Sequence, residues 1–153
     1  MPKPNRLTSR EDALNILEQG SYGILSTVSI DGQPYGVPVN YVYLKEENCI
    51  FFHCAMIGKK IDNMTANNKV SFTVVLYEKI IQEKYTTYYE GVIAEGTVSF
   101  ITDEKEKRQK LFLLCERFSP DFSNSRKEFI DKYANETAIY KININEISGK
   151  RNI

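Results

Sequence analysis

The sequence predicts an α+β protein, mainly β, whose centre is a six-stranded antiparallel β-barrel with flanking helices. Six runs rich in β-branched and aromatic residues are joined mainly by short turns, and the longer helical patterns lie at the start and late in the chain. Strands and helices do not alternate, and no G-x-G-x-x-G or G-x-x-x-x-G-K-[ST] occurs, which excludes a Rossmann unit. The expected strands are residues 22–29, 35–44, 49–55, 70–77, 86–101 and 138–144.

Capping and turn residues define the first elements. Thr8 is followed by Glu11 three positions later, a capping box that predicts the start of the first helix at Thr8. The dipeptide Asp31-Gly32 predicts a tight hairpin between the first two strands. Because Pro38 cannot donate a backbone hydrogen bond, we expect a bulge or an unpaired edge position in the second strand.

Glycines interrupt the longest expected strand. After a loop over residues 79–85, the strand at 86–101 contains Gly91 and Gly96, which we expect at bulges where a barrel turns a corner. The final strand, 138–144, leaves a short basic tail that contains Gly-Lys-Arg.

Three further helices are expected. A short helix covers residues 60–67, a longer one begins after Asp103 with Glu106 completing its cap, and another covers 125–133. The longer helix carries an apolar stripe with the spacing i, i+3, i+4, i+7. The stripe consists of Leu111, Leu114, Cys115 and Phe118.

Length and charge limit the classes of function. A chain of 153 residues most simply forms one domain, residues 1–153, with one sizeable core. Its 20 basic and 20 acidic residues cancel, so no overall field favours nucleic acid or an anionic membrane as a partner. No apolar run approaches the roughly 20 residues that span a bilayer, and no signal peptide is visible, so we expect a cytoplasmic protein.

A metal site is not expected. The cysteines Cys49, Cys54 and Cys115 are scattered without a C-x-x-C pair, and His53 is the single histidine. His53 and Cys54 are neighbours on an expected strand, so their side chains point to opposite faces. One ion could hardly bind both.

The most informative segment is 51–64, in which an apolar strand leads through a turn at Gly58 into two lysines and a helix. Lys59 and Lys60 bring cationic donors next to free backbone N–H groups, and this combination suits a phosphate group. The alternative is a solvated charged pair on a turn. The segment predicts an anion site without naming its ligand.

A set of separated motifs spans most of the chain, from about residue 20 to residue 150. In order they are G-x-L-S-T-V at 23–28, D-G-x-P-Y-G-V-P-V-N-Y-V-Y at 31–43, F-H-C-A and G-x-K-x-D-N within 52–63, N-x-K-V-S-F-T-V-V at 67–75, T-T-Y-Y-E-G at 86–91 and S-G-K at 148–150. This order resembles the nitroimidazole-resistance branch of the pyridoxamine 5'-phosphate oxidase-like, FMN-binding split-barrel family.

The resemblance implies a split-barrel fold and a homodimer that holds FMN at its interface with residues from both subunits. It implies that the flavin ring lies along the second strand, that the glycine–lysine turn takes the phosphate, and that the long strand contributes further contacts. The implied cofactor-binding residues are Val37, Pro38, Val39, Asn40, His53, Gly58, Lys59, Lys60, Asn63, Tyr88, Tyr89 and Lys150.

Two of these residues have a more specific implied role. His53 is the implied catalytic residue, because the histidine of the resembled branch lies beside the flavin, where it can transfer a proton or anchor a substrate. A lone histidine in an apolar strand is often structural, and that interpretation stays open. Asn63 is implied to reach the phosphate from the first turn of its helix.

The implied activity is an FMN-dependent reduction of small oxidised compounds, such as nitroaromatics and 5-nitroimidazoles. Oxidation of vitamin B6 is disfavoured, because the terminal arginine-containing segments of true pyridoxamine phosphate oxidases are missing. The alternatives are the same fold with haem or a deazaflavin, a non-catalytic flavin-binding module for storage, sensing or sequestration, and a dimeric scaffold without cofactor.

Overall fold

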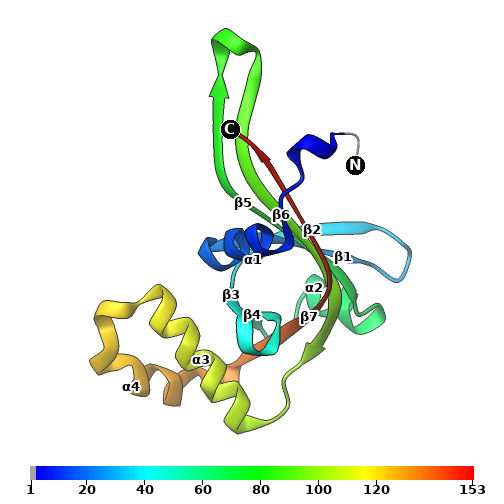
Figure 1. Ribbon diagram of the computed structural model, residues 1–153. Coiled ribbons are helices and arrows are strands. Elements are labelled where there is room, and N and C mark those ends of the chain that lie inside the picture. Colours follow the sequence, from blue (N-terminus) through cyan, green and yellow to red (C-terminus); the bar gives the residue numbers. More distant parts are fainter. Residues whose placement is uncertain (1–2) are drawn as a thin grey trace.

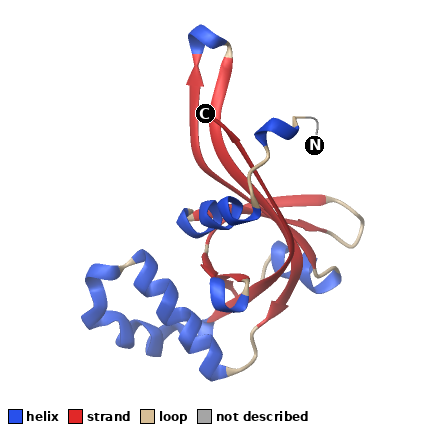
Figure 2. Ribbon diagram, in the orientation of Figure 1, coloured by secondary structure: helices blue, strands red, loops and turns tan. Residues whose placement is uncertain are grey.

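In the computed structural model, residues 3–153 form one curled antiparallel sheet with four α-helices around it (Figure 1, Figure 2). The α+β, mainly β class predicted from the sequence is confirmed. The strands are β1 Tyr22–Val28, β2 Pro34–Asn40, β3 Val42–Leu44, β4 Cys49–Ala55, β5 Lys69–Ile81, β6 Thr86–Phe100 and β7 Thr137–Asn152. The α-helices are α1 Arg10–Gln19, α2 Lys59–Ala66, α3 Glu104–Phe118 and α4 Ser123–Tyr133.

The strand order β2-β1-β5-β6-β7-β4-β3 explains how the sheet closes. β2 and β3 lie at opposite edges, yet only Tyr41 separates them in sequence, so the sheet curls until its edges meet at this residue. Tyr41 is fully buried, and its hydroxyl donates to the carbonyl of Leu17. The single strand expected over 35–44 is therefore two, because the pairing partner changes from β1 to β4, and the barrel has seven strands rather than six.

β5 and β6 extend beyond the barrel as a long two-stranded arm (Figure 1). β5 continues to Ile81, and the 3₁₀ turn Gln82–Lys84 connects it to β6. The loop expected over 79–85 is therefore wrong at its start, because residues 79–81 pair with β6. Residues 79–81 are Lys-Ile-Ile, and the charged pair Glu78-Lys79 breaks the apolar alternation just before the two isoleucines, so the strand becomes evident only from its pairing with β6.

Two register shifts bend the long strands. One follows Val75 in β5, opposite Gly91, and the other lies between Glu95 and Gly96, where β6 pairs with β7. A Cβ atom at Gly96 would lie 2.1 Å from the carbonyl oxygen of Asn143, so a side chain there would force the backbone apart. The irregularities therefore fall at the two expected glycines, but the extra residue lies in the partner strand each time, Leu76 in β5 and Asn145 in β7.

The last strand is more than twice as long as expected, with 16 residues. Instead of ending at residue 144 before a basic tail, β7 continues to Asn152 along β6, with Lys150 opposite Gly91. Leu7 adds an isolated bridge to Lys150. Neighbours on both sides thus order a segment whose own apolar pattern is weak.

Two apolar cores occupy opposite faces of the sheet. The first fills the barrel, where β4 contributes Phe52 and Cys54. The second lies between the outer face and the α3–α4 layer, where β4 contributes Cys49 and Phe51 (Figure 1). His53 follows in the outer row, so His53 and Cys54 point to opposite faces, as predicted.

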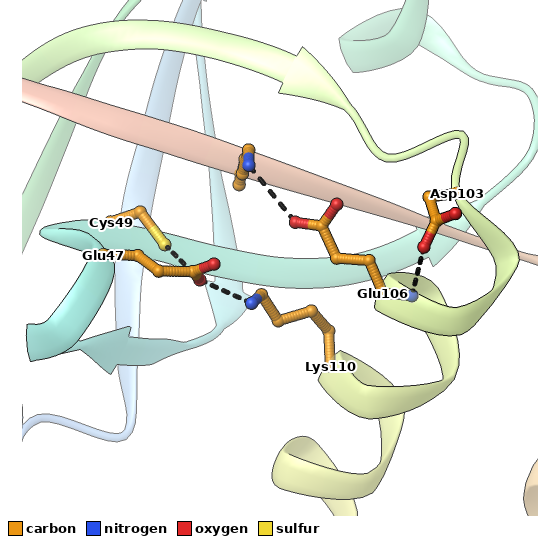
Figure 3. Close-up of polar contacts among 6 residues, drawn as sticks. Glu47, Cys49, Asp103, Glu106 and Lys110 are labelled. Carbon is orange, nitrogen blue, oxygen red and sulfur yellow. Dashed lines mark hydrogen bonds and ion pairs between the residues drawn. The ribbon is translucent and has the colours of Figure 1, made fainter.

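The helix caps were predicted with mixed success. Ser9, rather than Thr8, caps α1, because its hydroxyl accepts a 3.0 Å hydrogen bond from the backbone N–H of Asp12. Asp103 caps α3 as predicted, by accepting a 2.8 Å hydrogen bond from the backbone N–H of Glu106 (Figure 3).

Two ion pairs attach α3 to the sheet. The Nζ of Lys110 lies 2.5 Å from an oxygen of Glu47 in the 3₁₀ turn Lys45–Glu47 (Figure 3), and the Lys110 side chain is only 1% exposed. Lys141 of β7 lies 3.2 Å from Glu106. The hydrogen bond from Lys110 lowers the pKa of Glu47, so this carboxylate is charged at neutral pH.

Candidate functional site

The outer edge of β2 offers backbone hydrogen-bonding groups to a ligand. β2 pairs with β1 on one side, and its other side has no strand partner within residues 3–153. Val37 and Val39 are half-buried against the barrel core, whereas Pro38 and Asn40 are exposed. Pro38 therefore lies in an edge strand, as predicted, and the free edge can bind a planar molecule through its backbone.

The start of α2 is uncapped and open to solvent. Gly58 has φ +146°, a conformation that favours glycine, and its Cβ position would be in open space. No side chain among the described residues caps α2, so the first N–H groups are available to a ligand. Lys59 and Lys60 follow, and the Nζ of Lys59 lies 4.7 Å from the ring centroid of Tyr35 in β2. Lys59 at the helix N-terminus thus lies beside β2, and the charge of Lys60 acts on His53 of β4.

His53 lies on the outer row of β4, where solvent still reaches it. The surrounding protein lowers the pKa of His53 below its ordinary value of 6.5, chiefly through burial of the ring and secondarily through the positive charge of Lys60. Both effects disfavour the imidazolium, so the ring is neutral at pH 7. A neutral imidazole donates a hydrogen bond at one nitrogen and accepts one at the other.

Asn63 has a structural role in this chain. It is the fifth residue of α2 rather than part of its first turn, and it is only 4% exposed. Its Nδ2 donates a 3.0 Å hydrogen bond to the hydroxyl of Thr27 in β1. The expectation of a first-turn position is wrong, because the buried amide joins the helix to the barrel.

Three predicted residues lie elsewhere in the protomer. Tyr88 and Tyr89 are on the arm, and Lys150 is on β7 near the base of the arm, away from α2 (Figure 1). The Nζ of Lys84 lies 2.9 Å from the Tyr88 hydroxyl. The predicted residues therefore form two groups within one chain, one on β2, β4 and α2 and one on the arm and the adjoining end of β7.

A cavity of about 360 Å³ lies between the α3–α4 layer and the sheet, and sequence reasoning missed it. Asn40 and His53 line it from the sheet side. The sequence feature that could have indicated the cavity is the apolar stripe of α3, because every residue of the stripe lines the cavity. These residues are Leu111, Leu114, Cys115 and Phe118.

Other reactive centres find no support in the described part of the chain. Residues 3–153 contain no group of three or more His, Cys, Asp or Glu side chains that could hold a metal ion. Burial raises the pKa of Cys49 to about 11 and also raises the pKa of Cys54, so both thiols stay protonated at neutral pH. No helix within the same residues is long and apolar enough to cross a membrane.

The fold is shared with solved structures of low sequence identity. A candidate 5-nitroimidazole antibiotic resistance protein from Bacteroides thetaiotaomicron is 24% identical, with a TM-score of 0.77 over 94% of this chain and 85% of that one. An FAD-binding protein from Mesorhizobium loti is 23% identical, with a TM-score of 0.65, and the match covers 97% of this chain and 98% of that one. An FAD and haem binding protein from Mycobacterium smegmatis is 19% identical, with a TM-score of 0.76, and the match covers 94% of this chain and 71% of that one. These likenesses show a split-barrel fold.

The sequence itself identifies the family. No curated protein matches the sequence at a significant level. A family described as pyridoxamine 5'-phosphate oxidase, in contrast, matches residues 9–151, which is nearly the whole chain and includes every predicted site residue. The chain therefore belongs to the pyridoxamine 5'-phosphate oxidase family.

Proposed function

We propose that this protein binds FMN and is an oxidoreductase that reduces small oxidised compounds, with nitroaromatics such as 5-nitroimidazoles as the substrate class. The observation that carries the proposal is the open start of α2, where Lys59 and Lys60 follow Gly58 and the Nζ of Lys59 lies over the ring of Tyr35 in β2. A phosphate carries about −1.5 to −2 charges at neutral pH, which two lysines balance. The family and its flavin-binding relatives support this assignment.

The residues present fit a flavin in shape as well as in charge. The open space at Gly58 leaves room for a phosphate, and the edge of β2 from Val37 to Asn40 offers backbone groups to a planar ring. When bound, FMN supplies two-electron redox chemistry with a reduced nicotinamide nucleotide or a similar donor. The protein groups supply position, charge balance and hydrogen bonds.

His53 is the group we assign to the reacting end of the substrate. A nitro group that accepts two electrons and two protons becomes a nitroso group and releases one water molecule, so the site must supply hydrogen bonds and protons. His53 is neutral at pH 7, because its pKa is lowered, and its N–H can donate to a nitro oxygen. This role does not require a standing positive charge.

The pH dependence of the reaction tests this role. If the neutral ring is the active form, kcat/KM should fall as the pH drops through the lowered pKa of His53, below 6.5, and stay level above it. The variant His53→Gln should lose this acid limb and be about tenfold slower at neutral pH, the effect of one lost hydrogen bond. Steady-state rates across the acid range measure both. If the variant keeps the same fall in kcat/KM at acid pH, His53 is not the group that titrates in the reaction, and the assigned role is wrong.

We also propose a homodimer, because the arm exposes large apolar side chains. Such patches mark interfaces in soluble proteins. A partner barrel packed against the arm would bring Tyr88, Tyr89 and Lys150 of one subunit to α2 of the other. The exposed apolar residues along the arm are Val75, Tyr77, Ile80 and Tyr85.

The double variant Tyr77→Asp, Ile80→Asp is expected to be monomeric, because two carboxylates in an apolar interface would have to lose their water. Light scattering after size-exclusion chromatography measures the mass. Ile30→Asp is the matched control, because Ile30 is 87% exposed in the β1–β2 hairpin turn, away from the arm. A wild-type protein that is monomeric, or an arm variant that stays dimeric, would contradict the proposed interface.

Haem is a second candidate cofactor, because a structural relative binds both FAD and haem. His53 is the single histidine of the chain and is accessible on β4 for an axial bond. An absorption spectrum of the purified protein separates the two cofactors, since haem gives a Soret band and oxidised flavin gives two bands at longer wavelength. Flavin bands that leave with released FMN would support the main proposal. A protein that is colourless and takes up no added FMN would overturn it.

Catalysis needs its own test, because a storage or sensing module would also bind FMN. We expect nitrobenzene to oxidise the reduced, protein-bound flavin faster than it oxidises reduced free FMN. Anaerobic stopped-flow absorbance measures both rates. Equal rates for bound and free reduced flavin would contradict the reductase activity and support a flavin-binding module.

A further inference from the structure

The cavity between the α3–α4 layer and the sheet has a composition that selects its ligand. Within the described chain, no Asp, Glu, Lys or Arg lines it. Burial raises the pKa of Cys115 and lowers the pKa of His53, so both of these lining groups are uncharged at pH 7. Lys60 acts on His53 and Arg126 acts on Cys115 from outside the lining, so an ion that entered would lose water without forming a direct ion pair, and the cavity favours neutral molecules.

The cavity wall is rich in aromatic rings. Phe118, Phe129 and Tyr133 line it, and the rings of Phe129 and Tyr133 lie 4.9 Å apart. All three remain more than one third exposed, so apolar surface at this cavity is not covered by the protein itself. A volume of about 360 Å³ is at the small end of ligand sites, which suits a molecule of one or two rings.

The polar end of the cavity coincides with the candidate functional site. Asn40, at the end of β2, and His53, on β4, line the cavity, and both belong to the residues predicted to lie along the flavin. The Nδ2 of Asn40 donates a 3.0 Å hydrogen bond to the carbonyl of Ser21, which holds its amide in place. The same two residues thus connect the cavity with the cofactor site.

We propose that this cavity binds a neutral aromatic molecule, with its ring among the apolar side chains of α3 and α4 and its polar substituent at Asn40 and His53. The inference rests on the proposed function, because it makes the cavity the place from which the oxidised substrate meets the flavin. It adds that the α3–α4 layer determines specificity and that anionic aromatic compounds are excluded.

A matched pair of probes tests the charge selection. The nitro group of 3-fluoronitrobenzene and the carboxylate of 3-fluorobenzoate have the same shape and differ in charge. Titration of each probe with protein, followed by ¹⁹F NMR, should show saturable binding of 3-fluoronitrobenzene and at least about tenfold weaker binding of 3-fluorobenzoate. The spectra report binding directly, with or without FMN. Equal affinities would overturn the charge argument.

A matched pair of variants tests the location. Phe118→Ala removes a ring that lines the cavity and should weaken 3-fluoronitrobenzene about tenfold, as expected for a lost apolar side chain. Phe112→Ala removes a similarly exposed ring from the same helix, outside the lining, and should leave the affinity unchanged. Cys115→Phe fills the cavity and should abolish binding, and a thermal melt confirms that each variant is folded. Equal effects of the two alanine variants would overturn the location.

The two proposals fail in different ways. Binding of 3-fluoronitrobenzene that depends on Phe118 in a protein that takes up no FMN would support the cavity and overturn the oxidoreductase. A protein that binds FMN but shows no saturable ¹⁹F signal change, with or without FMN, would overturn the cavity and leave the flavin site standing.

Discussion

Replacing Lys59 and Lys60 together by Ala is expected to weaken FMN binding about a hundredfold or more. Each lysine would supply one charge-assisted contact to the phosphate, worth about 1.5–3 kcal/mol, and about 1.4 kcal/mol corresponds to a factor of ten in Kd. The backbone N–H groups of α2 remain in the variant, so binding should be weakened rather than abolished. Titration of the apoprotein with FMN, followed by flavin fluorescence, measures the change.

Two controls separate the phosphate contact from a general charge effect. Lys45→Ala combined with Lys105→Ala removes the same charge from two exposed positions and should leave the Kd for FMN unchanged. Riboflavin has the same ring without the phosphate, so it should bind the wild type more weakly than FMN does. Its Kd should be the same for the wild type and for the variant that lacks Lys59 and Lys60. A parallel loss of riboflavin affinity would mean that the lysines hold the site together instead of binding phosphate.

Removing the partner of Lys110 is expected to give a large loss of stability. Glu47→Ala leaves an ammonium that is 1% exposed without its carboxylate, and we expect the free energy of unfolding to fall by about 2 kcal/mol. This is below the usual range of about 3–5 kcal/mol for a broken buried pair, because the Glu47 side is 41% exposed and water can approach. Urea unfolding followed by circular dichroism measures the loss.

A second substitution distinguishes the buried charge from lost packing. Glu47→Ala combined with Lys110→Met removes both charges and keeps an unbranched side chain at the buried position, so most of the stability should return. Asp131→Ala disrupts an exposed pair with Arg108, whose side chains are 39% and 46% exposed, and should change stability little. Equal effects of Glu47→Ala and Asp131→Ala would contradict the argument.

The parts of the fold that depend on near neighbours in sequence were predictable. The turn at Gly32 has φ +83°, β4 has the expected bounds, and Asp103 caps its helix. Each of these features rests on a few adjacent residues, whose conformational preferences are strong. The lysine turn after Gly58 was found for the same reason, since glycine, lysines and the start of a helix are consecutive.

The features that depend on distant partners were not predictable in this way. Tyr41 ends a strand because the two edges of the sheet meet there, and the end of β7 is ordered by β6 and Leu7. An asparagine side chain can bind phosphate, but the amide of Asn63 donates its hydrogen bond to the hydroxyl of Thr27, 36 positions earlier in the chain. The cavity needs two helices and the outer face of β4 at once, so a single apolar stripe could indicate only that the helix packs against something.

The two separate cores have a consequence for how the protein can diverge. The barrel that carries β2, β4 and α2 is stabilised from its interior, whereas the α3–α4 layer is stabilised from the other face of the sheet. Substitutions in the helical layer therefore alter the second core without reaching the first. Descendants of this chain can change α3 and α4, and with them the ligands of the proposed cavity, while the barrel and the cofactor it is proposed to hold persist.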